Sequence, residues 1–230
     1  MKLMVIDTAL GACLAGCFTV EGVDVTPLGL RREEMTKGHQ ERLGGMARDA
    51  AADAGGLSGV ERIGVTVGPG SFTGLRVGLS FALGLGAALN AQVVGISTLD
   101  ALAASVPAQG RVVAAIDARR GQVYMRRFRD GVAVSEAEAL PLAEAVALIL
   151  ADGPVSDVVI VGSGGSVLFE NDAALGEAQI IAMVAPSAEA LARLTASLDP
   201  DVSPPKPLYL RAPDATPPTR LPGQPRTAAS

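Results

Sequence analysis

The apolar runs along the chain recur in the same order in its two halves. Each half opens with a β-branched strand that ends in aspartate, Ile6-Asp7 in the first and Ile116-Asp117 in the second, and a turn that contains glycine follows. At the same offset Phe18 matches Phe128, and an acidic residue before glycine then indicates a hairpin turn in each half. Self-similarity of this kind predicts two copies of one structural unit.

Helical patterns and glycine-rich loops continue the repeat. Residues 39–54 and 142–151 have helical periodicity, and each is followed by a buried strand that runs into a glycine-rich loop, at residues 68–71 and 162–166. A further helix is predicted over residues 187–198, with Ser187 as its cap.

This order of elements predicts an α/β protein with two βββαβα units side by side. We place the first unit in residues 1–108 and the second in residues 109–212. The proline-rich residues 213–230 contain almost no large apolar side chains, so we expect them to be disordered.

Composition narrows the class of protein. A chain of 230 residues with 49% apolar content can bury a full core, and its formal net charge of -5 argues against a strong independent grip on a phosphate backbone. Cys13 and Cys17 lie about 13 Å apart along one predicted strand, so they cannot bond to each other and fit a reducing cytosol as buried thiols. The longest apolar run, residues 77–91, is shorter than the roughly 20 residues that a bilayer requires. We expect a cytoplasmic protein that binds no membrane.

The segment from Gly68 to Gly78 is the most distinctive stretch of the sequence. Pro69 and the glycines predict a tight turn between a strand and a helix, and Ser71 is placed to cap that helix. The spacing is not that of a P-loop, and the P-loop lysine is absent. Both a packing turn and an anion site at the start of the helix fit this pattern.

Small residues form a stripe on the helix that follows. Gly74, Gly78, Ala82 and Gly86 recur every four residues, and leucines such as Leu75 and Leu79 cover much of the remaining surface. Each glycine costs about 1 kcal/mol relative to alanine inside a helix, so tight packing must offset the cost. The stripe can lie in the core of this chain or face a helix of a partner, and we take it as a candidate partner interface.

Four segments together resemble the TsaB (YeaZ) family: Asp7-Thr8, residues 68–78, residues 116–124 and residues 207–211. The resemblance spans roughly residues 1–211. It implies the duplicated ribonuclease-H-like fold of actin and the sugar kinases, which agrees with the internal repeat.

The resemblance also implies a function and partners. A TsaB-like chain is expected to be a non-catalytic dimerisation subunit that activates TsaD, the enzyme that transfers a threonylcarbamoyl group to the adenosine next to the anticodon of tRNAs reading ANN codons. TsaE is expected to join the pair, a homodimer is expected in the absence of TsaD, and tRNA is expected to bind only through the complex. An active phosphotransferase or a glycoprotease-like hydrolase of the same fold is the alternative.

Individual residues favour the non-catalytic hypothesis. TsaD-type metal sites use two histidines four residues apart, whereas Leu43 stands four residues after His39, the single histidine of this chain. We therefore expect no catalytic metal and place His39 and Leu43 with the partner interface. The phosphate turns of this fold usually have glycine two residues after the aspartate, where this chain has Ala9 and Arg119.

A vestigial nucleotide or anion site is still a candidate, with turn capping by the two aspartates as the alternative. We expect no tightly bound cofactor, with ATP or ADP as a candidate at a subunit junction. The basic hairpin between Arg119 and Arg129 is either a solvated strand face or a place that helps a partner hold tRNA. The candidate site comprises Asp7, Gly68, Gly70, Ser71, Asp117, Arg119 and Gly164.

Overall fold

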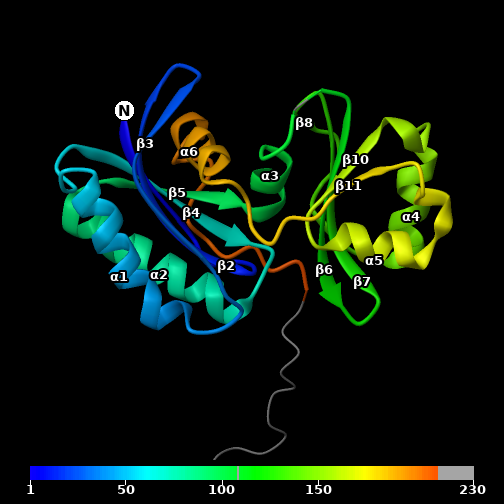
Figure 1. The fold of residues 1–230 in the computed structure, drawn as a ribbon, viewed down its shortest axis with the longest axis horizontal. Helices are drawn as coiled ribbons and strands as arrows, with labels where there is room; N and C mark the ends of the chain where they lie inside the picture. Colours follow the sequence, from blue (N-terminus) through cyan, green and yellow to red (C-terminus); the bar gives the residue numbers. More distant parts are fainter. Residues whose placement is uncertain (108, 212–230) are drawn as a thin grey trace, which may run out of the picture.

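The computed structural model describes residues 1–107 and 109–211, which form two lobes, each around one sheet (Figure 1). The first sheet has the strand order β3-β2-β1-β4-β5, in which β2 and β3 are antiparallel neighbours and β4 and β5 are parallel to β1. Its strands are β1 (Lys2–Asp7), β2 (Ala12–Glu21), β3 (Asp24–Glu34), β4 (Val60–Gly68) and β5 (Gln92–Ser97).

The second sheet has the same connectivity around its central strand. Its order is β11-β10-β6-β7-β8, with β9 paired to β7, so β6 takes the place that β1 has in the first sheet. The shared order confirms the predicted duplication. The strands are β6 (Arg111–Arg119), β7 (Gln122–Arg129), β8 (Val132–Ala133), β9 (Glu138–Pro141), β10 (Val158–Val161) and β11 (Gln179–Ile181).

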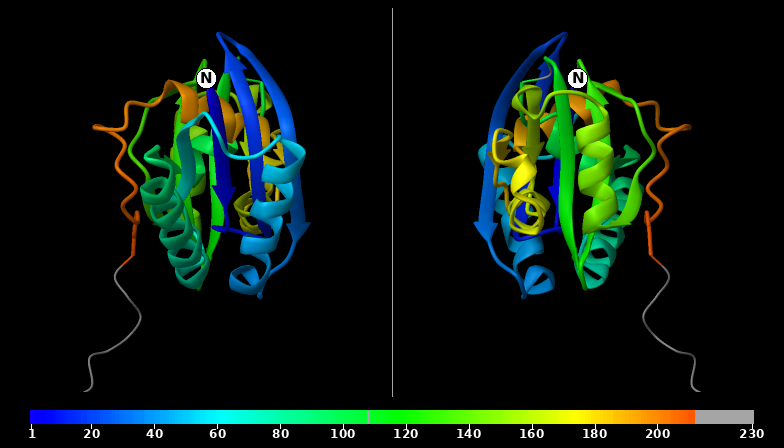
Figure 2. Two further views of the ribbon diagram at one scale, coloured as in Figure 1. Left: turned by 90° about the vertical axis from the view of Figure 1, so that its left-hand side faces the viewer. Right: turned by 90° about the vertical axis from the view of Figure 1, so that its right-hand side faces the viewer.

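Alternation along β1 shows how the first sheet is covered on both faces. Met4 and Ile6 pack in one apolar cluster with α1 (His39–Asp53) and α2 (Phe72–Leu89), whereas Leu3 and Val5 pack in another with α6 (Ala188–Ser197). Period-two burial of this kind follows from the pleat of a strand. Helices α1 and α2 lie side by side on the outer face, as Figure 2 shows in its left view.

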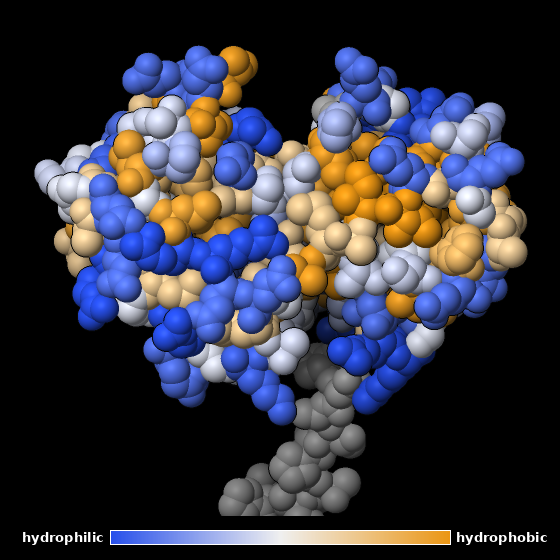
Figure 3. All heavy atoms as spheres, viewed as in Figure 1, coloured by the Kyte–Doolittle hydropathy of each residue, from blue (hydrophilic) through white to orange (hydrophobic). Residues whose placement is uncertain are grey.

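The remaining helices complete the second lobe and the junction. Helices α4 (Leu142–Ala151) and α5 (Gly164–Asn171) pack on the outer face of the second sheet, together with the short 3-10 turns Val155–Asp157 and Ala173–Leu175. Helix α3 (Thr98–Ala103) packs against β6 at the junction. The surface is hollowed between the two lobes (Figure 3).

The predicted second unit, residues 109–212, does not pack as one body. Helix α6 returns to the first sheet, and the segment after it runs along the same lobe, where the backbone N–H of Leu208 donates to the carbonyl of Val67 at 2.7 Å. The physical reason is that Ala188, Leu191 and Ala192 of α6 bury the apolar face of β1 and β2 in one cluster. The disorder predicted for residues 213–230 lies outside the described residues.

Both cysteines are free and buried in β2, as predicted. Burial, followed by the nearby Asp7 carboxylate, raises the pKa of Cys13 to about 11. Burial also raises the pKa of Cys17. Both thiols therefore stay protonated at neutral pH. Helix α2 is long and apolar enough to cross a membrane by length and composition alone, which is weak evidence, and one of its sides packs on the sheet.

Candidate functional site

A cleft of about 450 Å³ lies where the two lobes meet, and the turn of each repeat forms one of its walls. The structure brings four of the predicted site residues to this cleft, Gly70, Ser71, Asp117 and Arg119, while the other three, Asp7, Gly68 and Gly164, do not line it. The lining residues are Ala9, Leu10, Gly11, Thr36, Gly70, Ser71, Ile116, Asp117, Ala118, Arg119, Tyr124, Ser163 and Val184.

Asp7 is fully buried at the end of β1. Its Oδ1 accepts the backbone N–H of Ala9 at 3.0 Å and the hydroxyl of Thr66 at 2.6 Å, whereas Oδ2 has no hydrogen-bond partner among the described residues. Burial raises the pKa of this carboxyl, and the bonds from Thr66 and Ala9 oppose the rise. The carboxyl therefore caps the turn between β1 and β2, which was the alternative to a nucleotide role.

Asp117 occupies the matching position in the second repeat but is only half-buried. Its Oδ1 accepts the backbone N–H of Arg119 at 2.8 Å, and its own N–H donates to the hydroxyl of Ser163 at 3.1 Å. The turn then passes through Arg119 at φ 63°, Arg120 at φ 56° and Gly121 at φ 70°. Both aspartates thus hold turns by the same bond to the second following residue.

The glycine-rich loop before α2 is fastened to the first turn. The N–H of Ser71 donates to the carbonyl of Ala9 at 2.7 Å, and the hydroxyl of Ser71 accepts the N–H of Gly74 at 3.2 Å. A side chain at Gly70 would collide with the same Ala9 carbonyl. This geometry is that of a packing turn, because the turn and the cap already use these donors.

Gly68 and Gly164 have packing roles away from the cleft. A Cβ on Gly68 would lie 2.8 Å from the carbonyl oxygen of Leu208, and one on Gly164 would lie 2.8 Å from the backbone of Ala115. Each glycine allows two segments to approach closely. Close packing of the backbone therefore accounts for glycine at both positions, and no ligand is needed to explain it.

His39 was expected at the surface or in a partner interface, and this is wrong for the isolated chain. Its side chain is 7% exposed, its Nε2 has no hydrogen-bond partner among the described residues, and Leu43 is 1% exposed in the apolar cluster below α1. Leu43 packs against the sheet, whereas His39 lines a pocket together with Ser71 and Thr73 at the start of α2. Across the described residues, no group of three or more His, Cys, Asp and Glu side chains is placed to hold a metal ion.

The small-residue stripe of α2 also faces inward, so its assignment to a partner interface is corrected. A Cβ on Gly74 would collide with the carbonyl of Thr8, one on Gly78 would lie 2.5 Å from the hydroxyl of Thr8, and one on Gly86 would collide with Val93. Ala82 is fully buried, and Leu75 and Leu79 are at most 5% exposed. The stripe serves close approach of α2 to the chain's own sheet.

Other helix glycines have no such explanation. A Cβ on Gly44 or Gly45 of α1, or on Gly84 of α2, would meet no atom of the described part of the chain within 4 Å. Beside them α2 exposes Leu83 by 47%. We name Gly44, Gly45, Leu83 and Gly84 the outer glycine face. The sequence analysis did not predict this face. Glycines that lie within a helical segment but outside its apolar positions could have indicated it.

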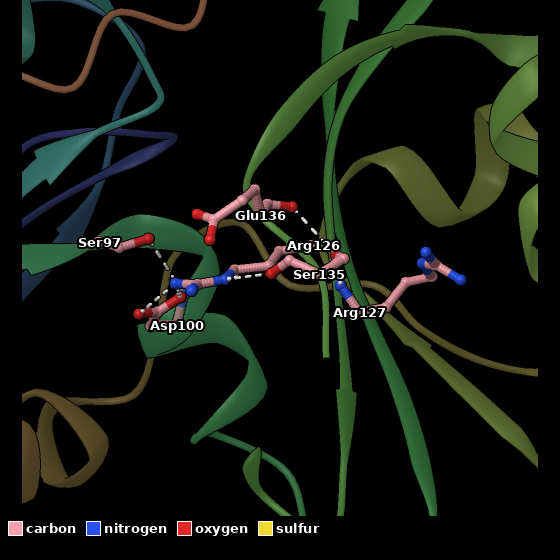
Figure 4. A network of polar contacts seen from close by, with 6 residues as sticks. All are labelled: Ser97, Asp100, Arg126, Arg127, Ser135 and Glu136. Carbon is pink, nitrogen blue, oxygen red and sulfur yellow. Dashed lines mark hydrogen bonds and ion pairs between the residues drawn. The ribbon is translucent and has the colours of Figure 1, made fainter. Parts of the chain in front are cut away.

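The basic hairpin is largely engaged in ion pairs, which reduces its predicted role in holding tRNA. Arg126 donates to both carboxylate oxygens of Asp100 at 2.7 and 2.8 Å and so joins β7 to α3. Arg127 points to the opposite side of the sheet (Figure 4), where it meets Asp152 at 2.6 Å. At the turn of the hairpin Arg119 keeps a largely exposed guanidinium, with its side chain 87% exposed.

The chain matches one family model and several known proteins. A family model described as TsaD, tRNA N6-adenosine threonylcarbamoyltransferase, matches residues 26–159. The chain is 32% identical over 133 residues to the Escherichia coli protein named tRNA threonylcarbamoyladenosine biosynthesis protein TsaB, which is 56% of this chain and 55% of that protein. It is 40% identical over 134 residues to an uncharacterized Mycobacterium leprae protein, which is 58% of this chain and 37% of that protein.

A solved structure extends the likeness over the whole fold. A Pseudomonas aeruginosa protein described as similar to the peptidase YeaZ matches with a TM-score of 0.71 and 27% identity, covering 91% of this chain and 99% of that chain. This agrees with the duplicated ribonuclease-H-like fold predicted from the repeat. The chain spans about half the length of the curated relatives that it matches.

Proposed function

The chain belongs to the TsaB (YeaZ) family, and from this premise we propose that it is a non-catalytic subunit of the bacterial system that makes threonylcarbamoyladenosine in tRNA. In this proposal it pairs with a TsaD-type transferase and activates it toward the adenosine next to the anticodon of tRNAs reading ANN codons. A TsaE-type ATPase joins the pair, and the chain forms a homodimer when the transferase is absent. The complex acts in the cytoplasm, and ATP or ADP binds at a subunit junction.

The outer glycine face is the observation that carries the role of a partner subunit. Glycine inside a helix costs about 1 kcal/mol relative to alanine, and no atom of residues 1–107 or 109–211 lies within 4 Å of a Cβ at Gly44, Gly45 or Gly84 to explain that cost. Close approach of a second protein to these positions on α1 and α2 would offset it. Helices α1 and α2 therefore supply the partner surface, through residues other than the buried stripe.

The cleft supports a non-catalytic role. The N–H of Ser71 and the N–H of Arg119, which an anion would need at the two turns, already bond to Ala9 and Asp117. The Asp7 carboxyl lies wholly below the surface, where no substrate meets it. The cleft would thus hold a nucleotide only weakly through this chain alone.

Reconstitution with the transferase tests the proposal. The purified chain is mixed with a TsaD-type transferase and a TsaE-type ATPase, and complex formation is measured by size exclusion with light scattering. Threonylcarbamoylation of tRNA is then followed by mass spectrometry with and without this chain. We expect a stable heterodimer and at least roughly tenfold stimulation. A transferase that neither binds the chain nor responds to it would contradict the proposal.

The alternative enzyme is tested on the isolated chain. ATP turnover and peptide hydrolysis are measured with wild-type protein and with the Asp7→Asn variant as a matched blank. Turnover that the wild type shows and the variant lacks would favour a phosphotransferase or hydrolase.

A further inference from the structure

Two aromatic rings and a guanidinium stack on the surface at the start of α2. The ring centroids of Phe72 and Tyr209 are 5.5 Å apart with an interplanar angle of 32°, and the Cζ of Arg76 lies 3.8 Å from the centroid of the Phe72 ring. Phe72 begins α2, whereas Tyr209 belongs to the segment that returns along the first lobe after α6. Two parts of the chain that are distant in sequence thus build one group, which we name the aromatic platform.

The platform joins two of the three most exposed aromatic rings among the described residues. The chain has five phenylalanines, two tyrosines and no tryptophan, and Phe72 is 48% exposed, Tyr209 45% and Phe169, in α5, 44%. Apolar ring surface left in water forgoes the free energy of burial, about 25 cal/mol per Å². Contact with a ligand that also has flat faces would recover it.

The two segments that carry the platform are basic, although the chain as a whole is acidic. The sequences of α2 and residues 203–211 contain Arg76, Lys206 and Arg211 but no Asp or Glu, although the chain has a net charge of -5. None of these three cations takes part in an ion pair between described residues. The N-terminal end of α2, which carries a partial positive charge, lies at Phe72 itself.

Arg211 connects the basic segment after α6 to the second lobe. The Nη1 of Arg211 donates to the carbonyl of Ala118 at 3.0 Å, and its Nη2 donates to the side chain of Gln122. These bonds bring the returning segment to the turn between β6 and β7, where Arg119 is largely exposed. Residues 209–211 therefore connect the stacking surface to the turn that carries Arg119.

We propose that the aromatic platform binds unpaired nucleotides of the tRNA substrate, with bases stacked on Tyr209, Phe72 or the Arg76 guanidinium and phosphates held by Lys206 and Arg119. Aromatic and guanidinium planes are the groups on which proteins stack splayed RNA bases, and the absence of acidic residues from both segments suits a polyanion. The inference rests on the proposed function. Because the net charge of the chain is negative, the platform adds to the tRNA binding of the partner transferase and does not replace it.

The first experiment uses the reconstituted complex of full-length chain, transferase and ATPase. Binding of fluorescently labelled tRNA is measured by anisotropy over a series of salt concentrations. Tyr209→Leu is expected to weaken binding about tenfold, within the range for removal of one base stack, while Tyr209→Phe keeps wild-type affinity because the ring is retained. Arg119→Gln and Lys206→Gln are expected to lower the slope of log affinity against log salt by about one for each phosphate that the variant no longer binds.

Complex formation by each variant is measured in parallel, which separates RNA contact from protein contact. Unchanged tRNA affinity of Tyr209→Leu would overturn the proposal, and release of the transferase from that variant would overturn it in favour of a protein interface. A wild-type chain that fails to bind the transferase contradicts the proposed function instead.

The second experiment needs no partner. The chain has no tryptophan, so in a Tyr124→Phe variant the tyrosine emission comes from Tyr209 alone. Titration at low salt with a short single-stranded RNA is expected to quench this emission, and the same RNA annealed to its complement is expected to quench it much less. Equal quenching by both probes, or by neither, would overturn the proposal.

Discussion

The two sides of the α1 and α2 layer use glycine for different reasons. On the inner side Gly74, Gly78 and Gly86 lie so close to the turn after β1 and to the start of β5 that no side chain fits. On the outer side Gly44 and Gly84 face open space. The same residue type at helical spacing therefore serves the core on one side and, by our proposal, a partner on the other. Glycine periodicity alone does not tell which.

The inner side gives the largest expected effect. Gly78→Leu places its Cβ 2.5 Å from the hydroxyl of Thr8, which donates to the carbonyl of Gly74 at 2.7 Å. Because the side chain of Thr8 and its buried hydrogen bond stand in the way, we expect the unfolding free energy to fall by more than about 3 kcal/mol, or no folded protein at all. Urea unfolding followed by circular dichroism measures it. A stable Gly78→Leu monomer that merely loses its partner would restore the interface role of the stripe.

The outer side should respond in the opposite way. The Cβ of Gly84→Leu meets no atom of the described residues within 4 Å, so we expect cooperative unfolding to be retained. The wedge is expected to weaken heterodimer and homodimer formation by more than about tenfold, since interface cores are packed as densely as interiors. Affinity is measured by light scattering and surface binding assays. Ala147→Leu on the exposed side of α4 is the matched control, and equal weakening in both variants would argue against the outer glycine face.

The matching aspartates of the two repeats, Asp7 and Asp117, can also be compared, and the expected effect on stability is smaller. Because burial raises the pKa of Asp7 above its usual value of 3.8, the folded state binds a proton more tightly than the unfolded state. The free energy of unfolding should therefore fall as pH rises from about 3.8 through the raised pKa, and Asp7→Asn should remove that part of the pH dependence.

Urea unfolding from mildly acidic to mildly alkaline pH measures the difference between wild type and variant. Asp117→Asn, whose carboxyl is half-exposed, is the matched variant in the other repeat. Both variants should leave threonylcarbamoylation by the assembled complex within about tenfold, because the carboxyls hold turns. A decrease of several orders of magnitude in an intact complex would restore a catalytic role.

Local signals predicted most of the fold. The repeat of Ile6-Asp7 and Ile116-Asp117 indicated the two sheets, and Ser71 and Ser187 cap α2 and α6 as expected. The return of α6 to the first sheet was missed, because no periodicity records which sheet an amphipathic helix covers. The platform was missed as well, since the contact of Phe72 with Tyr209 joins segments that only the fold brings together.

Replacement of single helix glycines by alanine is expected to change the unfolding free energy least. The sign of that change should differ between the inner and outer sides of the α1 and α2 layer. Gly44→Ala and Gly84→Ala add a methyl group in open space, so each should raise the unfolding free energy of the isolated chain by about 0.5–1 kcal/mol through helix propensity. Gly86→Ala is the inner counterpart, and it should lower that free energy because its Cβ collides with Val93. The sign of the change is read from urea midpoints at constant slope. If the outer alanines stabilise the monomer yet weaken the heterodimer, glycine is retained there for the partner. If they stabilise the monomer and leave affinity unchanged, the partner lies on another surface.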